Sequence, residues 1–293
     1  MSKWPPIDEP ELRRRLAMDD EEFAAFIRGL VSELAPRDYG PDVLTQAVGY
    51  PWSRPPGSFL LRGGDVELLG SLAPAERDGV LARFSAAGGG RLPVLSIGSN
   101  AAPEVLARKF AHFDGEDDRA LLALSGRLHD FDVGVAAQPT MYGSMPATLF
   151  PSPGTAVATT LLWVTPAQFT QLAWSEITYR LGELRTRFDV DESAAGFDRV
   201  LVFVSRFGAF CPDDHPVALA AIPASGRTAP ALTQEQLLDA AAALALGPGA
   251  DAETLVRAIF EDTAEVIAKV AATVHQAALP FASDHWTPYG GGA

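Results

Sequence analysis

The chain has 293 residues, of which 47% are hydrophobic and 20% are charged, a composition typical of a globular protein with a sizeable core. The formal net charge of −14 argues against a nucleic-acid-binding surface, because affinity for nucleic acid depends on clustered lysine and arginine side chains. A single cysteine, Cys211, excludes an intramolecular disulfide and a zinc site built from several cysteines.

No apolar run follows Met1, and no stretch is long enough to span a bilayer. The sequence therefore predicts neither a secretion signal nor a membrane anchor, and we expect a cytoplasmic protein. We divide the chain into three predicted parts: an N-terminal extension over residues 1–90, a core over 91–225 and a C-terminal extension over 226–293.

The N-terminal extension is predicted to begin with an amphipathic helix. Asp20 can cap this helix, which we expect to end by Pro36. Its apolar residues fall on one face and are Phe23, Phe26, Ile27, Leu30 and Leu34. Such a face needs a partner surface elsewhere in the chain.

A hairpin is predicted next, because Phe59–Leu61 and Val66–Leu69 flank the pair Gly63-Gly64. A short helix over 75–85 follows and leads to Gly88-Gly89-Gly90. Three consecutive glycines interrupt any regular structure, so we place the boundary of the core there.

The core begins with a stretch that changes character halfway along. Leu92–Ile97 is apolar and partly β-branched, as in a buried strand, whereas Glu104–Phe110 has the spacing of a helix. Gly98, Ser99 and Asn100 lie between them. Further strands are expected near 131–137, 145–150, 156–164, 199–205 and 217–222.

A helix over 166–176 interrupts these strands. Thr165 can cap it, and Pro166 takes the first helical position, where its missing N–H group costs nothing. The final part of the chain is also predicted to be helical. Thr233 and Gln236 resemble a capping box for a helix over 234–245.

Asp251 is expected to cap one long helix that reaches about Leu279. Its apolar stripe consists of Leu255, Ile259, Val266, Val270 and Val274. This stripe permits a homodimer through the terminal helices, or packing on the core of the same chain.

Glu176 is the first candidate for chemistry. It is the next member of the apolar face formed by Phe169, Leu172 and Ala173. A carboxylate on such a face loses solvation, which favours proton uptake and suits a general base. Two other interpretations stay open: a partly exposed residue that bends away at the helix end, or a buried glutamate paired with an arginine such as Arg180.

The turn at Gly98-Ser99-Asn100 is the second candidate. A strand, a turn of small residues and a helix start direct free N–H groups toward an anion or a developing oxyanion. Many strand-to-helix turns use glycine and asparagine for geometry alone, so the motif on its own leaves both interpretations open. The glycine spacing and the lack of a following lysine exclude a phosphate-binding P-loop.

Other reactive residues are assigned structural roles. Asp213-Asp214-His215 precedes Pro216 and is interpreted as a solvated turn, because adjacent ligands do not easily face one ion. Cys211 is interpreted as a small buried apolar residue. We therefore expect no metal site.

Three segments together resemble a known family. In order they are IGSN (97–100), GRLHDFDVGVAAQ (126–138) and MPATLFPSPGTAVATTLLWVTPAQFTQLAWSE (145–176). This order is similar to that of the gamma-glutamyl cyclotransferases, whose members open a helix after a Tyr-Gly-Ser-Asn turn and end a later helix in a catalytic glutamate. The resemblance covers about 91–205, and neither flank is part of it.

The resemblance implies a fold and a reaction. The implied fold is α+β, a mixed sheet partly closed into a barrel with flanking helices, to which helical extensions are added. The implied reaction is attack of the α-amine of a γ-glutamyl group on its own γ-carbonyl, giving 5-oxoproline and a free amine. By position, Glu176 would be the general base, and Ile97, Gly98, Ser99 and Asn100 would hold the γ-glutamyl end of the substrate. No cofactor is implied.

The chain departs from the family at Ile97, where the family has a tyrosine. The change removes an aromatic ring and a hydroxyl group from the expected site. Together with the long extensions, it motivates a second hypothesis: a catalytically inactive protein on the same fold that binds a small molecule or regulates a partner. Turnover of a γ-glutamyl substrate would distinguish the two hypotheses.

Overall fold

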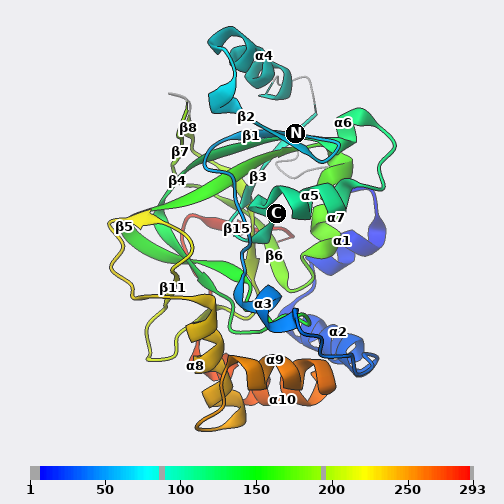
Figure 1. Cartoon of the computed structure of the whole chain (residues 1–293), viewed down its shortest axis with the longest axis vertical. Helices are drawn as coiled ribbons and strands as arrows, with labels where there is room; N and C mark the ends of the chain where they lie inside the picture. Colours follow the sequence, from blue (N-terminus) through cyan, green and yellow to red (C-terminus); the bar gives the residue numbers. More distant parts are fainter. Residues whose placement is uncertain (1–6, 86–89, 193–195, 291–293) are drawn as a thin grey trace.

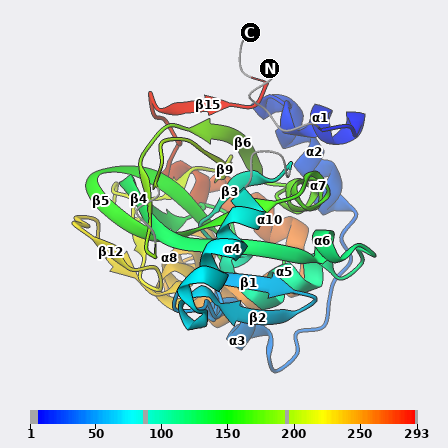
Figure 2. The same ribbon diagram turned by 90° about the horizontal axis from the view of Figure 1, so that it is seen from above.

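A computed structural model describes residues 7–85, 90–192 and 196–290. Gly88 and Gly89 of the predicted boundary lie outside the described residues. A large mixed sheet runs through the middle of the molecule (Figures 1 and 2). The helices α8, α9 and α10 gather at one end of the molecule and α4 lies at the other (Figure 1).

The α-helices are α1 (Pro10–Leu16), α2 (Asp20–Ser32), α3 (Val43–Val48), α4 (Pro74–Ser85), α5 (Pro103–Phe110), α6 (Glu116–Arg119), α7 (Pro166–Ser175), α8 (Gln234–Leu246), α9 (Ala252–Glu261) and α10 (Thr263–Ala272). The strands are β1 (Phe59–Arg62), β2 (Asp65–Leu68), β3 (Leu92–Ser96), β4 (Ala120–Val135), β5 (Ala147–Val164), β6 (Tyr179–Leu184), β7 (Phe188–Val190), β8 (Gly196–Phe197), β9 (Val200–Ser205), β10 (Ala209–Phe210), β11 (Ala218–Leu219), β12 (Ala224–Ser225), β13 (Ala231–Leu232), β14 (Ala278–Leu279) and β15 (Trp286–Pro288).

Two long antiparallel strands, β4 and β5, form the backbone of the sheet, whose main path has the order β13-β11-β4-β5-β3-β9-β6-β15. β3 pairs with β5 in the antiparallel sense and with β9 in the parallel sense, so the sheet is mixed. The predicted α+β class is therefore confirmed.

The predicted closure into a barrel is wrong. A barrel requires the outermost strands of the sheet to pair with one another. In the described part of the chain, β13 pairs only with β11 and β15 pairs only with β6. Both strands are short, so the sheet ends there and remains open.

The predicted hairpin is present as β1 and β2, and Gly63 and Gly64 both adopt positive φ at its turn. β1 also pairs with β4, so this hairpin extends the main sheet. Strand β15 near the C-terminus pairs with β6 in the same way. One sheet therefore includes strands from all three predicted parts of the chain.

The helix starts follow local capping signals. The side chain of Thr165 accepts a hydrogen bond from the backbone N–H of Gln168, and the side-chain oxygen of Gln168 accepts one from the backbone N–H of Thr165. Helix α7 therefore starts as predicted. Helix α8 begins with the predicted box at Thr233 and Gln236. Helix α2, however, is capped by Asp19 rather than by Asp20.

The predicted long C-terminal helix is wrong, because it divides into α9 and α10. Asp262 between them leaves the helical conformation, with φ of −149° and ψ of 83°, and its side chain accepts a hydrogen bond from the N–H of Glu265. The apolar stripe continues across the break: Leu255, Ile259, Val266, Val270 and Val274 are all buried in the main core. The stripe thus packs on its own chain, and a homodimer stays a prediction.

Three strand predictions also change. The segments expected near 145–150 and 156–164 are one continuous strand, β5, and β4 begins at Ala120 rather than near residue 131. Strand β6 was not predicted. In the described residues, no helix combines the length and the apolar character that crossing a bilayer requires.

Candidate functional site

Glu176 lies at the end of α7, where it is the residue that follows the last helical position. Phe169, Leu172 and Ala173 of the same face are buried in the apolar cluster beneath the helix. Burial of this face packs the helix against the sheet. The Glu176 side chain that follows it is 16% exposed. The carboxylate oxygen Oε1 accepts a hydrogen bond of 2.8 Å from Nδ2 of Asn100.

The turn at 98–100 joins β3 to α5, as the sequence predicts. Gly98 precedes a short 3₁₀ turn over Ser99–Ala101, and the first N–H groups of such a turn have no acceptor inside it. Arg54 donates hydrogen bonds of 3.0 Å to the carbonyl oxygens of Ile97 and Gly98. The carbonyl groups are thereby held on the side of Arg54.

Gly98 is required by a close approach. A side chain added at this position would place its Cβ atom 2.3 Å from the hydroxyl oxygen of Tyr50. That hydroxyl accepts a hydrogen bond of 2.8 Å from the N–H of Ala147, and the hydroxyl of Tyr179 donates one of 2.8 Å to the carbonyl of the same residue. Two tyrosine hydroxyls therefore lie near the turn although position 97 is isoleucine.

Burial raises the pKa of both Tyr50 and Tyr179, so both hydroxyl groups are neutral at physiological pH. A neutral hydroxyl can both donate and accept a hydrogen bond. Both side chains line the same cavity as Glu176. Tyr50 was missed by the sequence analysis as a site residue, because it is far from the turn in sequence and only the fold brings it there.

Lys109 of α5 is a further residue that the sequence analysis missed. Its ammonium group donates hydrogen bonds of 2.7 Å to Oδ1 of Asn100 and of 2.7 Å to Oγ of Ser175, and lies 3.7 Å from Oε1 of Glu176. Burial lowers the pKa of Lys109, and the negative charge of Glu176 partly opposes this effect. No sequence signal singles it out, since a lysine in the last helical turn is commonplace.

The hydrogen bonds form a chain from Lys109 through Asn100 to Glu176. Because Lys109 donates to Oδ1 of Asn100, the amide nitrogen of Asn100 must point the other way, toward Glu176. Of the two open interpretations, the buried glutamate paired with an arginine is the closer one. The cation is Lys109, however, and Arg180 pairs with Asp20 instead.

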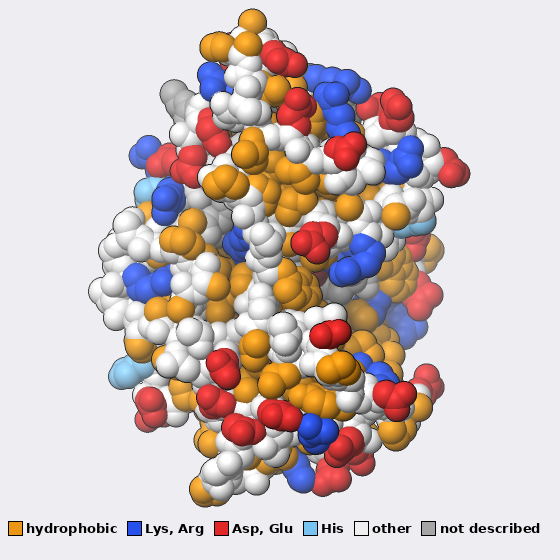
Figure 3. All heavy atoms as spheres, in the orientation of Figure 1, with side chains coloured by type: hydrophobic (Ala, Val, Ile, Leu, Met, Phe, Trp, Pro, Cys, Tyr) orange, Lys and Arg blue, Asp and Glu red, His pale blue; other side chains and the backbone are white. Residues whose placement is uncertain are grey.

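One cavity of about 740 Å³ brings all of the predicted site residues together. Glu176 lines it with the four residues of the turn, Ile97, Gly98, Ser99 and Asn100. Figure 3 shows hydrophobic side chains reaching the surface between α5 and α2, where the cavity residues of these two helices lie. Glu176 and the Gly98-Ser99-Asn100 turn thus border a common space, and a carboxylate in such a place suits a ligand with a cationic group.

The residues with predicted structural roles are elsewhere. Asp213, Asp214 and His215 are exposed in a turn, and within the described ranges no three histidine, cysteine, aspartate or glutamate side chains gather where they could hold a metal ion. Cys211 is buried, and burial raises the pKa of its thiol. None of these residues lines the cavity described above.

No family model and no curated protein matches the chain. Among solved structures, one titled gamma-glutamyl cyclotransferase is 17% identical, with a TM-score of 0.31, and the match covers 39% of this chain and 66% of that one. An uncharacterised protein from Homo sapiens is also 17% identical, with a TM-score of 0.30, over 40% of this chain and 67% of the other. Both likenesses concern a part of the fold only.

Proposed function

We propose that the cavity is the active site of an enzyme that closes γ-glutamyl amines or γ-glutamyl peptides to 5-oxoproline and releases the amine. The observation that carries this proposal is the position of the Glu176 carboxylate, which faces the 98–100 turn in one cavity and is held by Asn100. The reaction needs a base for an ammonium group and N–H donors for an oxyanion, and we assign the first role to Glu176 and the second to the N–H groups of the turn.

The proposed mechanism begins with the α-ammonium group of the substrate against Glu176, which takes one proton from it. The free amine attacks the γ-carbonyl carbon of the same molecule and forms a tetrahedral oxyanion, which the N–H groups of Ser99 and Asn100 stabilise. The bond to the leaving nitrogen then breaks, and Glu176 returns protons to that nitrogen. Two of the three ammonium protons thus end on the released amine, and no water is consumed.

Nucleophile and target belong to one molecule, so most of the catalytic advantage comes from holding the substrate in a folded conformation. The neutral hydroxyls of Tyr50 and Tyr179 flank Ala147 beside the turn and can orient polar groups of the substrate. We assign them an orienting role only. The step needs no redox chemistry, so the mechanism uses side chains and backbone groups of this chain alone.

Replacing Lys109 by methionine is expected to lower kcat/KM about tenfold. The substitution removes the donor that orients Asn100, and loss of a hydrogen bond to a charged group is worth about 1.5–3 kcal/mol, which corresponds to a factor of ten or more in rate. Steady-state kinetics measure the effect on kcat/KM.

Lys269→Met is the matched control for this prediction. Lys269 forms an exposed ion pair with Glu265 on α10, so its loss should leave kcat/KM unchanged. A Lys109→Met enzyme with the same kcat/KM as Lys269→Met would contradict the assigned link to Glu176.

The proposed reaction is tested directly with a panel of γ-glutamyl amides, measuring 5-oxoproline by mass spectrometry. We expect product from the amides with a free α-amine and none from their N-acetyl derivatives, because acetylation removes the nucleophile. Absence of 5-oxoproline from every free amide would overturn the proposed function.

A binding protein is the second candidate, and the pairing of Glu176 favours it. A carboxylate that already accepts from Asn100 and faces the Lys109 ammonium group can hold a substrate ammonium group without taking its proton. In that case γ-glutamyl amides should raise the melting temperature of the protein and remain intact. Catalytic turnover would exclude this alternative.

A further inference from the structure

One wall of the cavity is an apolar stripe on helix α2 and the residues that follow it. Ile27, Leu30, Val31 and Leu34 all line the cavity and share one helical face. Phe23 is the buried residue of α2, and none of these four is buried. A stripe with this spacing normally packs into a core, whereas here it borders an open space.

Exposed apolar side chains also border the cavity, beside the exposed polar residues Gln46, Glu104, Arg108 and Ser175. Six large hydrophobic side chains in the described residues are more than a third exposed, and three of these six line this cavity. They are Leu30 at 38%, Met141 at 45% and Tyr142 at 44%. Single exposed hydrophobic residues are common, but a group around one cavity indicates a binding surface.

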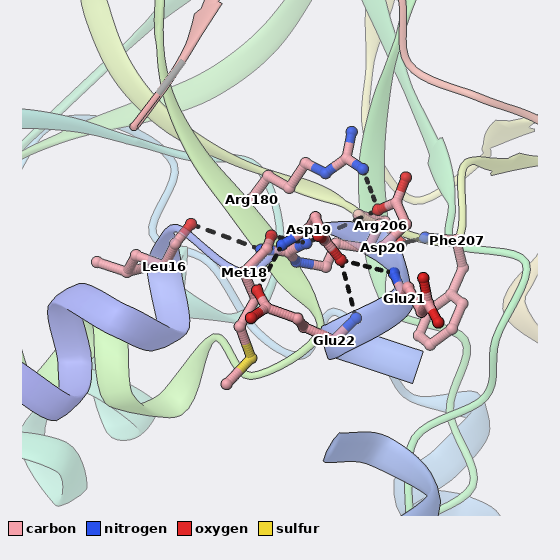
Figure 4. Close-up of polar contacts among 10 residues, drawn as sticks. Leu16, Met18, Asp19, Asp20, Glu21, Glu22, Arg180, Arg206 and Phe207 are labelled. Atoms are coloured by element: carbon pink, nitrogen blue, oxygen red, sulfur yellow. Dashed lines mark hydrogen bonds and ion pairs between the residues drawn. The ribbon is translucent and has the colours of Figure 1, made fainter. Parts of the chain in front are cut away.

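The position of α2 is fixed by contacts at its N-terminal end (Figure 4). Arg206, whose side chain is buried, donates hydrogen bonds to the carbonyl oxygens of Met18, at 2.9 Å, and of Leu16, at 3.5 Å. Arg180 forms an ion pair with Asp20. The stripe is therefore presented to the cavity by an anchored helix.

Aromatic packing adds to this anchor. The Phe23 ring lies 5.7 Å from the ring of Phe207, and the guanidinium group of Arg206 lies 4.7 Å from the Phe23 ring centroid. Phe207 itself lines the cavity, so the anchored end of α2 adjoins the same space as its stripe. The apolar stripe of α2 and the contacts that anchor this helix therefore adjoin the same cavity.

We propose that the α2 side of the cavity accommodates an apolar leaving group, so that the substrates are γ-glutamyl amides of alkyl or aryl amines. This inference rests on the proposed function, which places the γ-glutamyl end at Glu176 and the 98–100 turn. Small-molecule pockets measure about 300–1,000 Å³, and a cavity of 740 Å³ lies in the upper part of this range. A γ-glutamyl group alone leaves much of that space empty, and the remaining wall contributed by α2 is apolar.

The test compares three substrates of the purified protein: the γ-glutamyl amides of methylamine and hexylamine, and γ-glutamyl-glutamate. We expect kcat/KM for the hexyl amide to exceed the other two values at least tenfold. The added methylene groups move out of water and into contact with the apolar α2 stripe. Equal values for the two amides would overturn the apolar preference and leave the proposed function standing. Preference for γ-glutamyl-glutamate would also overturn it and would point to Arg108, which lines the cavity.

The variant Leu30→Asp tests whether the α2 stripe causes the preference for the hexyl amide. Leu30 is already 38% exposed, so a charge there remains hydrated, but the hexyl-to-methyl ratio of kcat/KM should fall to within threefold of unity. Ala25→Asp places the same charge on an exposed position of α2 that does not line the cavity, and the ratio should stay as in the parent protein. A ratio unchanged in Leu30→Asp would contradict the inference. No product from any substrate would overturn the proposed function, and this inference with it.

Discussion

Replacing Glu176 by glutamine is expected to lower kcat about 10²–10⁴-fold, the usual contribution of a positioned general base. The amide has nearly the same shape as the carboxylate and can still accept the hydrogen bond from Asn100, but it does not accept a proton from the substrate ammonium group. The loss should therefore appear in kcat with the fold unchanged. Steady-state assay of 5-oxoproline, together with circular dichroism, measures both.

Glu183→Gln provides the matched control for the Glu176 variant. Glu183 is a buried carboxylate on β6 that pairs with Arg185, and it does not line the cavity. Its replacement should leave kcat within about threefold of the parent value. A Glu176→Gln enzyme as active as this control would show that Glu176 is not the base.

Replacing Arg227 by methionine is expected to lower the free energy of unfolding by about 3–5 kcal/mol, the cost of leaving one partner of a buried ion pair alone. Asp132 on β4 is fully buried, and Arg227 contacts both of its carboxylate oxygens, with Nε to Oδ2 at 2.7 Å and Nη2 to Oδ1 at 2.8 Å. The substitution leaves the charge of Asp132 in the core without this partner. Urea denaturation monitored by circular dichroism gives the difference.

Two comparisons distinguish the stability lost with this ion pair from a general effect of removing a charge. Arg257→Met breaks an exposed pair with Glu253 and should cause a far smaller change. The double variant Asp132→Asn, Arg227→Met removes both charges and should recover part of the lost stability. If Arg227→Met were no less stable than Arg257→Met, the buried pair would not stabilise the junction of β4 with the loop after β12.

The elements predicted correctly are those with local signals. Helix α7 follows from Thr165 and Pro166, whose effects act within one helical turn, and the β1–β2 hairpin follows from two glycines between apolar runs. Glu176 could be singled out because helical periodicity assigned it to the apolar face of α7. The strand, turn and helix around Gly98 were predicted from an apolar run, three small residues and helical spacing within one stretch of sequence. Glu176 and this turn line one cavity.

What could not be predicted depends on contacts between distant residues. Lys109 meets Asn100 and Ser175, and Tyr50 meets Gly98 and Ala147, only because the fold brings their elements together. The break at Asp262 was missed because periodicity reports which residues are buried, and the buried stripe continues through it. Whether the sheet closes depends on pairing at its edges, which alternation within one strand does not reveal.

Ring closure by the substrate's own amine is tested most directly by running the reaction in water labelled with oxygen-18. We expect 5-oxoproline and amine in equal amounts, with no label in the 5-oxoproline, because water takes no part in the step. Labelled glutamate would show hydrolysis at the γ-carbonyl in place of cyclisation, and the proposed reaction would then be wrong.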